Sequence, residues 1–267
     1  MNGIALSPDG IALAYEVHGT GKPALVFVHG WSCDRSYWRN QLGHFARRHQ
    51  VVALDLAGHG ESGVGRREWT MSSFGRDVDA VVDQLDLDEA VLIGHSMGVD
   101  VVVEAALELP GRVCGLVLVD QYASLGQPRT PARTRALVAP FLEDFATTTR
   151  SLVREMFVPG SPPELVEWVV NDMADAPRDV AIGALEQTWS NDGPILESLR
   201  KVPAPKVAIN SDIRPTDIEA LERYGIRTLI ATGVGHFLML ENPDSFNRLL
   251  SEALSGFKAS ALAQRRD

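Results

Sequence analysis

The sequence predicts an α/β protein with a mostly parallel sheet and helices on both of its faces. Short, continuous apolar segments alternate along the chain with segments whose apolar residues recur every three or four positions. Continuous apolar segments are typical of strands that are buried on both faces, as in a parallel sheet. The first two segments, 3–8 and 11–17, instead flank Asp9-Gly10, which predicts an antiparallel hairpin at the edge of the sheet.

The central strands and the helices between them follow one another in a regular order. Six apolar segments that end near a polar residue or a glycine predict strands at 24–28, 51–54, 91–93, 116–119, 207–209 and 227–230. Apolar residues at helical spacing predict helices at 36–47, 73–86, 97–109, 216–224 and 243–257. Pro243 lies in the first turn of the last helix, where proline is favoured. Residues 258–267 are expected to form a frayed or solvent-exposed end.

One long segment interrupts this order, between the sixth and seventh strands. Residues 121–205 contain helical patterns at 135–157 and 163–174 and no convincing strand. A structureless loop of this length is uncommon inside a compact domain. We therefore predict a core made of residues 1–120 and 206–267, with residues 121–205 forming a helical cap over one end of the sheet.

Composition and charge narrow the class of protein. Of the 267 residues, 45% are hydrophobic and 22% are charged, which excludes a disordered or fibrous chain. The formal net charge of −10 disfavours binding to nucleic acid and to anionic membranes, because both are negatively charged. A small molecule is the expected partner, and the sequence leaves the oligomeric state open.

The cysteines and the N-terminus predict a cytoplasmic location. Cys33 and Cys114 are too few for a disulfide framework, and neither has a cysteine or histidine partner at metal-ligand spacing. The first residues lack the basic region and the apolar stretch of a signal peptide. No apolar segment approaches the ~18 residues of a membrane span. We therefore expect an intracellular protein without a metal site.

The motif that carries the chemistry lies where the fifth strand meets a helix. Residues 94–98 are Gly-His-Ser-Met-Gly, a G-x-S-x-G pattern between an apolar strand and an apolar helical segment. Glycines permit a tight turn there, which would hold Ser96 in a strained conformation with its hydroxyl exposed. The following helix N-terminus offers free amides and a partial positive charge. The pattern predicts that Ser96 is a nucleophile, the alternative being a serine in an ordinary loop.

A serine hydroxyl needs a base to take its proton, and His236 is the candidate. It follows the last strand and precedes the last helix, so it is expected at the carboxyl ends of the parallel strands, where Ser96 also lies. His44 and His49 are expected to be solvated and His18 peripheral. His95 adjoins the serine but should point away from it and serve in packing.

Two backbone amides are candidates for stabilising the oxyanion that forms during acyl transfer. Met97 follows the nucleophile and can offer its N–H. The loop after the third strand, His29-Gly30-Trp31, lies at the same edge of the sheet, and the N–H of Trp31 is the second candidate donor. The alternative for this loop is a simple turn that ends the strand.

Taken together and in this order, these residues resemble the α/β-hydrolase superfamily over most of the chain except the helical insertion. The matching segments are His29-Gly30-Trp31, residues 55–62, residues 94–98 and Gly235-His236-Phe237. The resemblance implies an eight-stranded, mostly parallel sheet with a helical cap between the sixth and seventh strands. It also implies a serine–acid–histidine triad, oxyanion donors at Trp31 and Met97, and no cofactor. Residues 55–62 look like a packing feature of the family.

The acid of the triad is the least settled of these residues. The family's usual acid follows the seventh strand in a Gly-x-x-Asp type of turn, which residues 210–217 do not match. Asp120, at the tip of the sixth strand, occupies the position that some members use instead. Asp212 is the alternative, although it could merely form a side-chain-stabilised turn, and Asp217 is expected to begin a helix. We predict that Asp120 is the acid.

The predicted function is hydrolysis of a carboxylic ester of a small, partly apolar molecule through an acyl-enzyme. An amide, lactone or thioester would use the same residues. The alternatives are a cofactor-free oxygenase that uses the His–Asp pair as a base, and a non-catalytic ligand receptor. Aromatic residues of the cap are expected near the substrate pocket, although at least half should only pack the cap onto the sheet: Phe141, Phe145, Phe157, Trp168 and Trp189.

Overall fold

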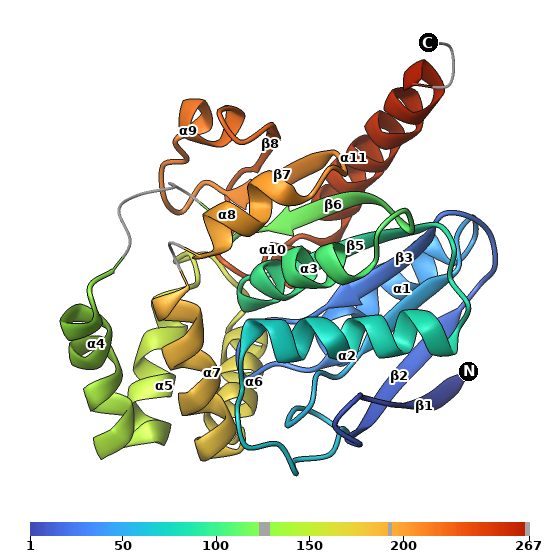
Figure 1. The fold of residues 1–267 in the computed structure, drawn as a ribbon. Helices are drawn as coiled ribbons and strands as arrows, with labels where there is room; N and C mark the ends of the chain where they lie inside the picture. Colours follow the sequence, from blue (N-terminus) through green and yellow to red (C-terminus); the bar gives the residue numbers. More distant parts are fainter. Residues whose placement is uncertain (123–128, 192–193, 265–267) are drawn as a thin grey trace.

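An eight-stranded sheet forms the centre of the molecule (Figure 1). The structure is a computed structural model that describes residues 1–122, 129–191 and 194–264. The strands are β1 (Asn2–Leu6), β2 (Ala12–His18), β3 (Ala24–Val28), β4 (Val51–Leu54), β5 (Ala90–His95), β6 (Val113–Val119), β7 (Lys206–Ser211) and β8 (Ile226–Ala231). They lie in the order β1-β2-β4-β3-β5-β6-β7-β8.

The direction of the strands confirms the predicted fold class. Only the pairs β1–β2 and β2–β4 are antiparallel, and all other neighbouring strands are parallel. Every residue of β3, β4 and β5 is buried, since helices cover both faces of the sheet. Val26 pairs with Val52 on one side and Leu92 on the other, which fixes the register at the centre of the core.

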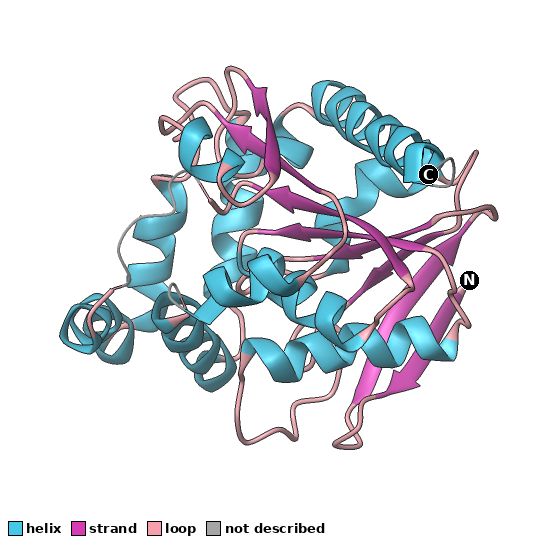
Figure 2. Ribbon diagram, turned by 45° about the horizontal axis from the view of Figure 1, so that its top comes forward, coloured by secondary structure: helices cyan, strands magenta, loops and turns pink. Residues whose placement is uncertain are grey.

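Helices form a layer on each face of the sheet (Figure 2). One face carries α2 (Met71–Gln84), α3 (Met97–Glu108) and α8 (Pro194–Lys201), in contact with one another through α3. The other carries α1 (Arg39–Phe45), α10 (Leu238–Glu241) and α11 (Pro243–Gln264). The Gln41 side chain donates to Met239 O and Asn247 Oδ1, which joins the three helices of this second layer.

Several predicted boundaries need correction. The predicted helix at 36–47 is a short 3-10 helix, η1 (Arg35–Trp38), followed by α1. The predicted helix at 216–224 shortens to α9 (Ile218–Glu222). The helical backbone of α11 continues to Gln264, so the end is not frayed up to that residue. That these residues are solvent-exposed stays a prediction, and residues 265–267 lie outside the described ranges.

The segment between β6 and β7 is helical wherever it is described, apart from its connecting turns. It contains α4 (Pro131–Glu143), α5 (Phe145–Arg154), α6 (Pro163–Ala174) and α7 (Arg178–Ser190), followed by α8. The single helical pattern predicted at 135–157 is two helices, because Asp144 adopts an extended backbone and accepts a hydrogen bond from Thr147 N as the cap of α5. The limits of the cap at 121 and 205 stay a prediction; α8 packs against α3 of the core.

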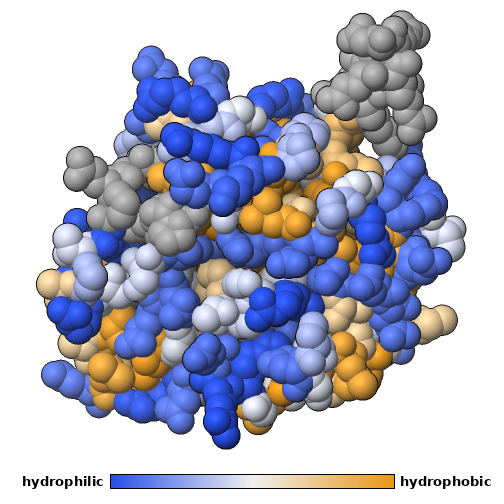
Figure 3. All heavy atoms as spheres, viewed as in Figure 1, coloured by the Kyte–Doolittle hydropathy of each residue, from blue (hydrophilic) through white to orange (hydrophobic). Residues whose placement is uncertain are grey.

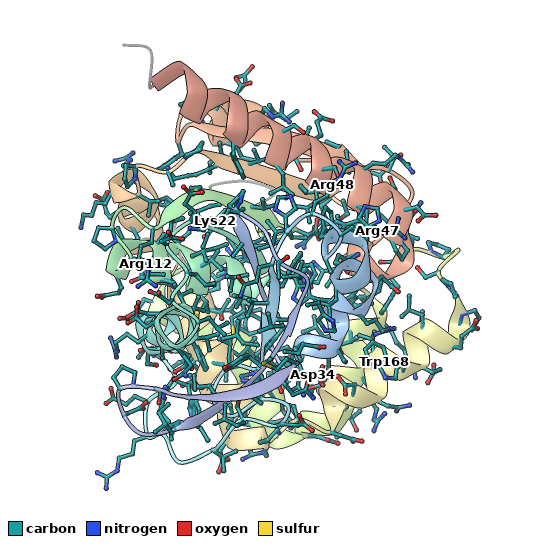
Figure 4. The ribbon with its side chains drawn as sticks, turned by 90° about the vertical axis from the view of Figure 1, so that its right-hand side faces the viewer. Lys22, Asp34, Arg47, Arg48, Arg112 and Trp168 are labelled. Carbon is teal, nitrogen blue, oxygen red and sulfur yellow. The ribbon has the colours of Figure 1, made fainter. Side chains whose placement is uncertain are left out.

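The cap helices α4–α7 lie at the carboxyl ends of the parallel strands (Figure 1). Trp31, which follows β3, donates its indole N–H to Ala181 O of α7 at 2.7 Å. Tyr37 of η1 donates to Asp172 of α6 at the same distance. Lys22 and Arg112, labelled in Figure 4, lie within two residues of the start of β3 and of β6, and therefore at the amino ends of these strands, opposite the cap.

Residues 55–62 pack as their resemblance to the family implies. The buried Asp55 carboxylate accepts hydrogen bonds from the backbone of Arg35 and Glu61 and pairs with the Arg35 side chain. Ser62 Oγ donates to Asp55 O and accepts from Ala14 N of β2. The loop thus ties β4 to η1 and to the edge hairpin.

The surface shown in Figure 3 is mostly hydrophilic, with apolar residues in small, separate patches. His44 is exposed as predicted, but His49 is buried and donates from Nδ1 to Pro23 O, so the expectation that it is solvated is wrong. Within the described ranges no helix is long and apolar enough to cross a membrane.

Candidate active site

Ser96 occupies a strained backbone conformation between β5 and α3. Its φ of 51° and ψ of −123° are unfavourable for a residue that carries a Cβ atom. The turn is held by two backbone hydrogen bonds, from Ser96 N to Val119 O and from Val99 N to Ser96 O. A Cβ atom on Gly94 would lie 2.2 Å from Gly98 O, so the tight turn requires glycine there. This is the strand–turn–helix geometry that the sequence predicts around Ser96.

The loop after β3 packs directly against this turn. A Cβ atom on Gly98 would lie 2.4 Å from His29 O, and one on Gly30 would lie 3.3 Å from the Ser96 Cβ atom. Trp31 and Met97, whose amides are the predicted oxyanion donors, line the same cavity as Ser96. Neither amide hydrogen-bonds to a backbone or side-chain acceptor within the described ranges. Both are thus available to a ligand, and their catalytic role stays a prediction.

His236 and Asp120 meet at the carboxyl ends of the strands. His236 Nδ1 lies 2.7 Å from Asp120 Oδ2, and both side chains are buried. The other carboxylate oxygen, Asp120 Oδ1, accepts from Ser211 N at 2.6 Å at the end of β7. Asp120 N donates to Ile209 O, which fixes the aspartate beside β7. The carboxylate is therefore held between the neighbouring strand and the histidine.

The surroundings of Asp120 favour its ionised form. Burial raises the pKa of the carboxyl, but the hydrogen bond and charge of His236 and the Ser211 amide together outweigh it, and the net pKa lies below its usual range. An ionised Asp120 accepts the proton on His236 Nδ1. The neutral imidazole then carries its lone pair on Nε2, the nitrogen that a general base uses.

The two alternative acids have other partners. Asp212 is exposed, and its Oδ1 accepts from Gly233 N at 2.9 Å in the turn after β8. Asp217 caps α9 by accepting from Ala220 N, as expected. The structure brings Asp120, and neither of these two, into contact with His236.

The loop that carries His236 is fixed by hydrogen bonds that the sequence did not suggest. The Glu241 carboxylate accepts from Gly235 N and Phe237 N, on either side of the histidine. His236 N donates to Met156 O at 2.8 Å, just beyond α5. Three consecutive backbone amides of the loop thus donate hydrogen bonds, two to Glu241 of α10 and one to Met156 of the cap. Glu241 lies four residues after Phe237, and only knowledge of the loop shape could have singled it out.

His95 is buried, in line with the predicted packing role, and it packs against His236, a contact that the sequence did not suggest. The two imidazole rings lie 4.6 Å apart, and His95 Nε2 donates to His236 O at 2.9 Å. Burial lowers the pKa of His95 to about 3, so the ring is neutral under physiological conditions. His95, the residue before the nucleophile, therefore holds the backbone carbonyl of His236 in place.

Ser96 and His236 face one cavity of about 560 Å³ that lies between the sheet and the cap. The Ser96 hydroxyl has no hydrogen bond to His236 in this structure. Catalytic hydrogen bonds of this kind often tighten only when substrate is bound. The cavity brings the predicted nucleophile, base and oxyanion donors to a single space.

The aromatic residues of the cap serve mainly in packing. Of the five considered, only Trp189 lines the cavity. Phe141 and Phe145 pack edge-on against Trp31, at 5.7 and 6.2 Å between ring centres. The remaining two contact core residues: Phe157 stacks on Phe237, and Trp168 packs against Tyr37 beneath Arg39. Aliphatic and thioether side chains form a further part of the cavity wall, beside its polar and charged residues: Leu137, Leu152, Met156, Leu185, Ile195 and Leu196.

The described residues contain no group of three histidine, cysteine or acidic side chains arranged to hold a metal ion. Cys33 and Cys114 are both free thiols.

Comparison with known proteins identifies the family. A model of the alpha/beta hydrolase family matches residues 25–249, and the chain therefore belongs to this family. It is 25% identical over 262 residues to 3-oxoadipate enol-lactonase 2 of Acinetobacter baylyi, an alignment that covers 94% of this chain and 96% of that protein. The resemblance seen in the motifs is thereby confirmed.

One further similarity covers part of the sequence, and another concerns the fold alone. Over 111 residues the chain is 35% identical to the dihydrolipoyllysine-residue acetyltransferase component of the acetoin cleaving system of Cupriavidus necator, which covers 42% of this chain but 30% of that protein. An esterase from Exiguobacterium antarcticum has the same fold, with a TM-score of 0.84 at 20% identity, covering 96% of this chain and all of that one.

Gly98→Ala is expected to lower the free energy of unfolding by about 1–3 kcal/mol, because the new methyl group would overlap backbone atoms of the β3 loop. Gly43→Ala in α1 is the matched control. Among the described residues no atom outside the neighbouring backbone of α1 lies within 4 Å of its Cβ position, and alanine should stabilise the helix by about 0.5–1 kcal/mol. Urea denaturation measures both values. Equal stability of the two variants would contradict the close packing at the Ser96 turn.

Proposed function

We propose that this chain is a serine hydrolase that cleaves a carboxylic ester, or a related acyl bond such as a lactone, through Ser96, His236 and Asp120. The observation that carries the proposal is the 2.7 Å contact between His236 Nδ1 and the buried Asp120 carboxylate, with His236 facing the same cavity as the strained Ser96. The similarity to an enol-lactonase and an esterase supports this reaction class.

The first half of the reaction forms an acyl-enzyme. Ser96 Oγ attacks the substrate carbonyl carbon, and its proton passes to His236 Nε2. The negative charge that develops on the carbonyl oxygen is stabilised by the amides of Trp31 and Met97. When the tetrahedral intermediate collapses, the bond to the leaving oxygen breaks, and His236 returns the proton to that oxygen.

The second half releases the acid. Water gives a proton to His236 Nε2 as its oxygen attacks the acyl carbon, and the collapse of the new intermediate restores the Ser96 hydroxyl. Asp120 keeps the Nδ1–H tautomer of His236 and stabilises the imidazolium that forms twice in each cycle. These steps need no metal ion or organic cofactor.

The cavity and composition support the remaining parts of the proposal. A cavity of about 560 Å³ whose wall combines aliphatic side chains with polar ones suits a small, partly apolar substrate. The two free cysteines suit a reducing compartment, and we propose the cytoplasm as the location.

Ser96→Ala is expected to lower kcat for p-nitrophenyl esters by about 10⁴- to 10⁶-fold, because it removes the nucleophile. A series of rising acyl length, followed by nitrophenolate release, measures the effect, and circular dichroism checks that the variant is folded. A phosphonate ester should modify Ser96 and no other residue. Near-wild-type turnover by Ser96→Ala would contradict the proposal, and oxygen uptake with a hydroxylated heteroaromatic compound would favour an oxygenase.

Asp120→Asn is expected to lower kcat by about 10⁴-fold, because an amide in place of the carboxylate favours the wrong histidine tautomer. Asp212→Asn is the matched control: within the described residues the exposed Asp212 carboxylate accepts only from Gly233 N, so this variant should change kcat little. The same ester assay compares the two variants. A large loss in Asp212→Asn beside a nearly normal Asp120→Asn would show that the acid follows β7 and not β6.

A further inference from the structure

The cavity that contains Ser96 carries an excess of positive charge at its wall. Besides His236 and Tyr122, the ionisable side chains that line it are Asp100 and three arginines, Arg129, Arg133 and Arg214. The chain as a whole has a net charge of −10. Arg133 and Arg214 thus place two guanidinium groups at one cavity of an acidic protein, and such a local cluster of positive charge attracts anions.

The three arginines come from different parts of the fold. Arg129 and Arg133 lie at the beginning of the cap, just before and within α4, and Arg214 lies in the core segment between β7 and α9. Figure 1 shows α4 at the left of the molecule and α9 above it. Cap and core therefore each supply a positive charge to the space between them.

The acidic residue of the wall is already engaged. Asp100 is buried in α3, and its Oδ1 accepts from the Tyr122 hydroxyl at 2.6 Å. Its Oδ2 accepts from Asn191 Nδ2 at 3.2 Å. Each oxygen thus accepts from at least one neutral donor, and no ion pair joins Asp100 to Arg133 or Arg214 within the described residues.

The guanidinium groups of Arg133 and Arg214 form no ion pair or hydrogen bond within the described ranges. Both residues are exposed, so their side chains can reach a ligand in the cavity without first breaking an internal contact. A guanidinium presents paired N–H donors whose spacing matches the two oxygens of a carboxylate. The aliphatic side chains of the wall, among them Leu137, Leu152 and Leu185, suit a short hydrocarbon chain between that carboxylate and the reacting carbonyl.

We propose that the substrate is an ester or lactone that carries a free carboxylate, held by Arg133 and Arg214 while its carbonyl carbon lies at Ser96. This inference rests on the proposed hydrolase function and adds the substrate class. The arginines bind and orient the substrate, and they take no part in bond breaking. Their charge should also speed the approach of an anion, an effect that salt weakens.

The test compares two esters that differ only in charge. The mono-p-nitrophenyl ester of adipic acid is anionic, and the same compound with its free carboxyl methylated is neutral. The ratio of kcat/KM for the anionic to the neutral ester is expected to exceed one in the wild type and to fall as NaCl is added. In the double variant Arg133→Gln/Arg214→Gln this ratio is expected to fall about 10-fold, mainly through KM, as for the loss of two exposed ion pairs.

Two other arginines provide matched controls. Arg135 lies on α4 and Arg223 directly follows α9, and both are exposed and lie outside the cavity wall. The double variant Arg135→Gln/Arg223→Gln removes the same amount of charge, but outside the cavity wall. It should therefore leave the ratio at its wild-type value. If both double variants lower the ratio equally, the effect belongs to net charge and the inference fails.

Binding without chemistry separates this inference from the proposed function. Adipate is expected to raise the thermal unfolding temperature of the wild type and of Ser96→Ala, and to have no effect on Arg133→Gln/Arg214→Gln. The inference alone would be overturned if the enzyme hydrolyses the neutral ester, the ratio of kcat/KM for the anionic to the neutral ester is one or less, and adipate does not stabilise the protein. Stabilisation by adipate with no Ser96-dependent turnover of either ester would overturn the hydrolase function instead.

Discussion

The hydrogen bond between Asp120 and His236 depends on almost every long-range feature of the fold. Asp120 ends β6, and His236 follows β8, so the two meet only because β6, β7 and β8 are adjacent and parallel. Ser211 at the end of β7 donates to the second carboxylate oxygen, which brings all three strand ends into one interaction. Met156 O accepts from His236 N and adds the cap to it. Sheet order and cap position are thus both required to orient one imidazole.

Two of the four non-glycine residues with a positive φ in the described chain lie at the same place. Ser96 and Asp120 both have a φ of 51°, a conformation that costs of order 1–3 kcal/mol for a residue other than glycine. Each is held by backbone hydrogen bonds to the neighbouring strand, Ser96 to Val119 O and Asp120 to Ile209 O. The fully buried strands around them supply the rigidity that such strain needs. The strain turns both side chains toward the edge of the sheet where the cavity lies.

The sequence was sufficient for features that depend on neighbouring residues and insufficient for those that depend on distant ones. Strand order along the chain and the turn at Ser96 follow from local apolar and glycine patterns, and the fold class was predicted correctly. The break at Asp144 was missed because apolar spacing continues across it, while its side chain caps the next helix. The roles of Glu241, Arg133 and Arg214 depend on where loops far apart in sequence come together, and no local pattern marks them.

The most direct test of this account is the tautomer of His236, measured by NMR in protein with ¹⁵N-labelled histidine at a pH where the ring is neutral. A carboxylate at Asp120 should keep the proton on Nδ1, and that proton should resonate downfield of ordinary imidazole protons. In Asp120→Asn the proton should move to Nε2, whereas Asp212→Asn should leave it on Nδ1. A proton on Nε2 in the wild type, or an unchanged Nδ1 proton in Asp120→Asn, would contradict the role of Asp120.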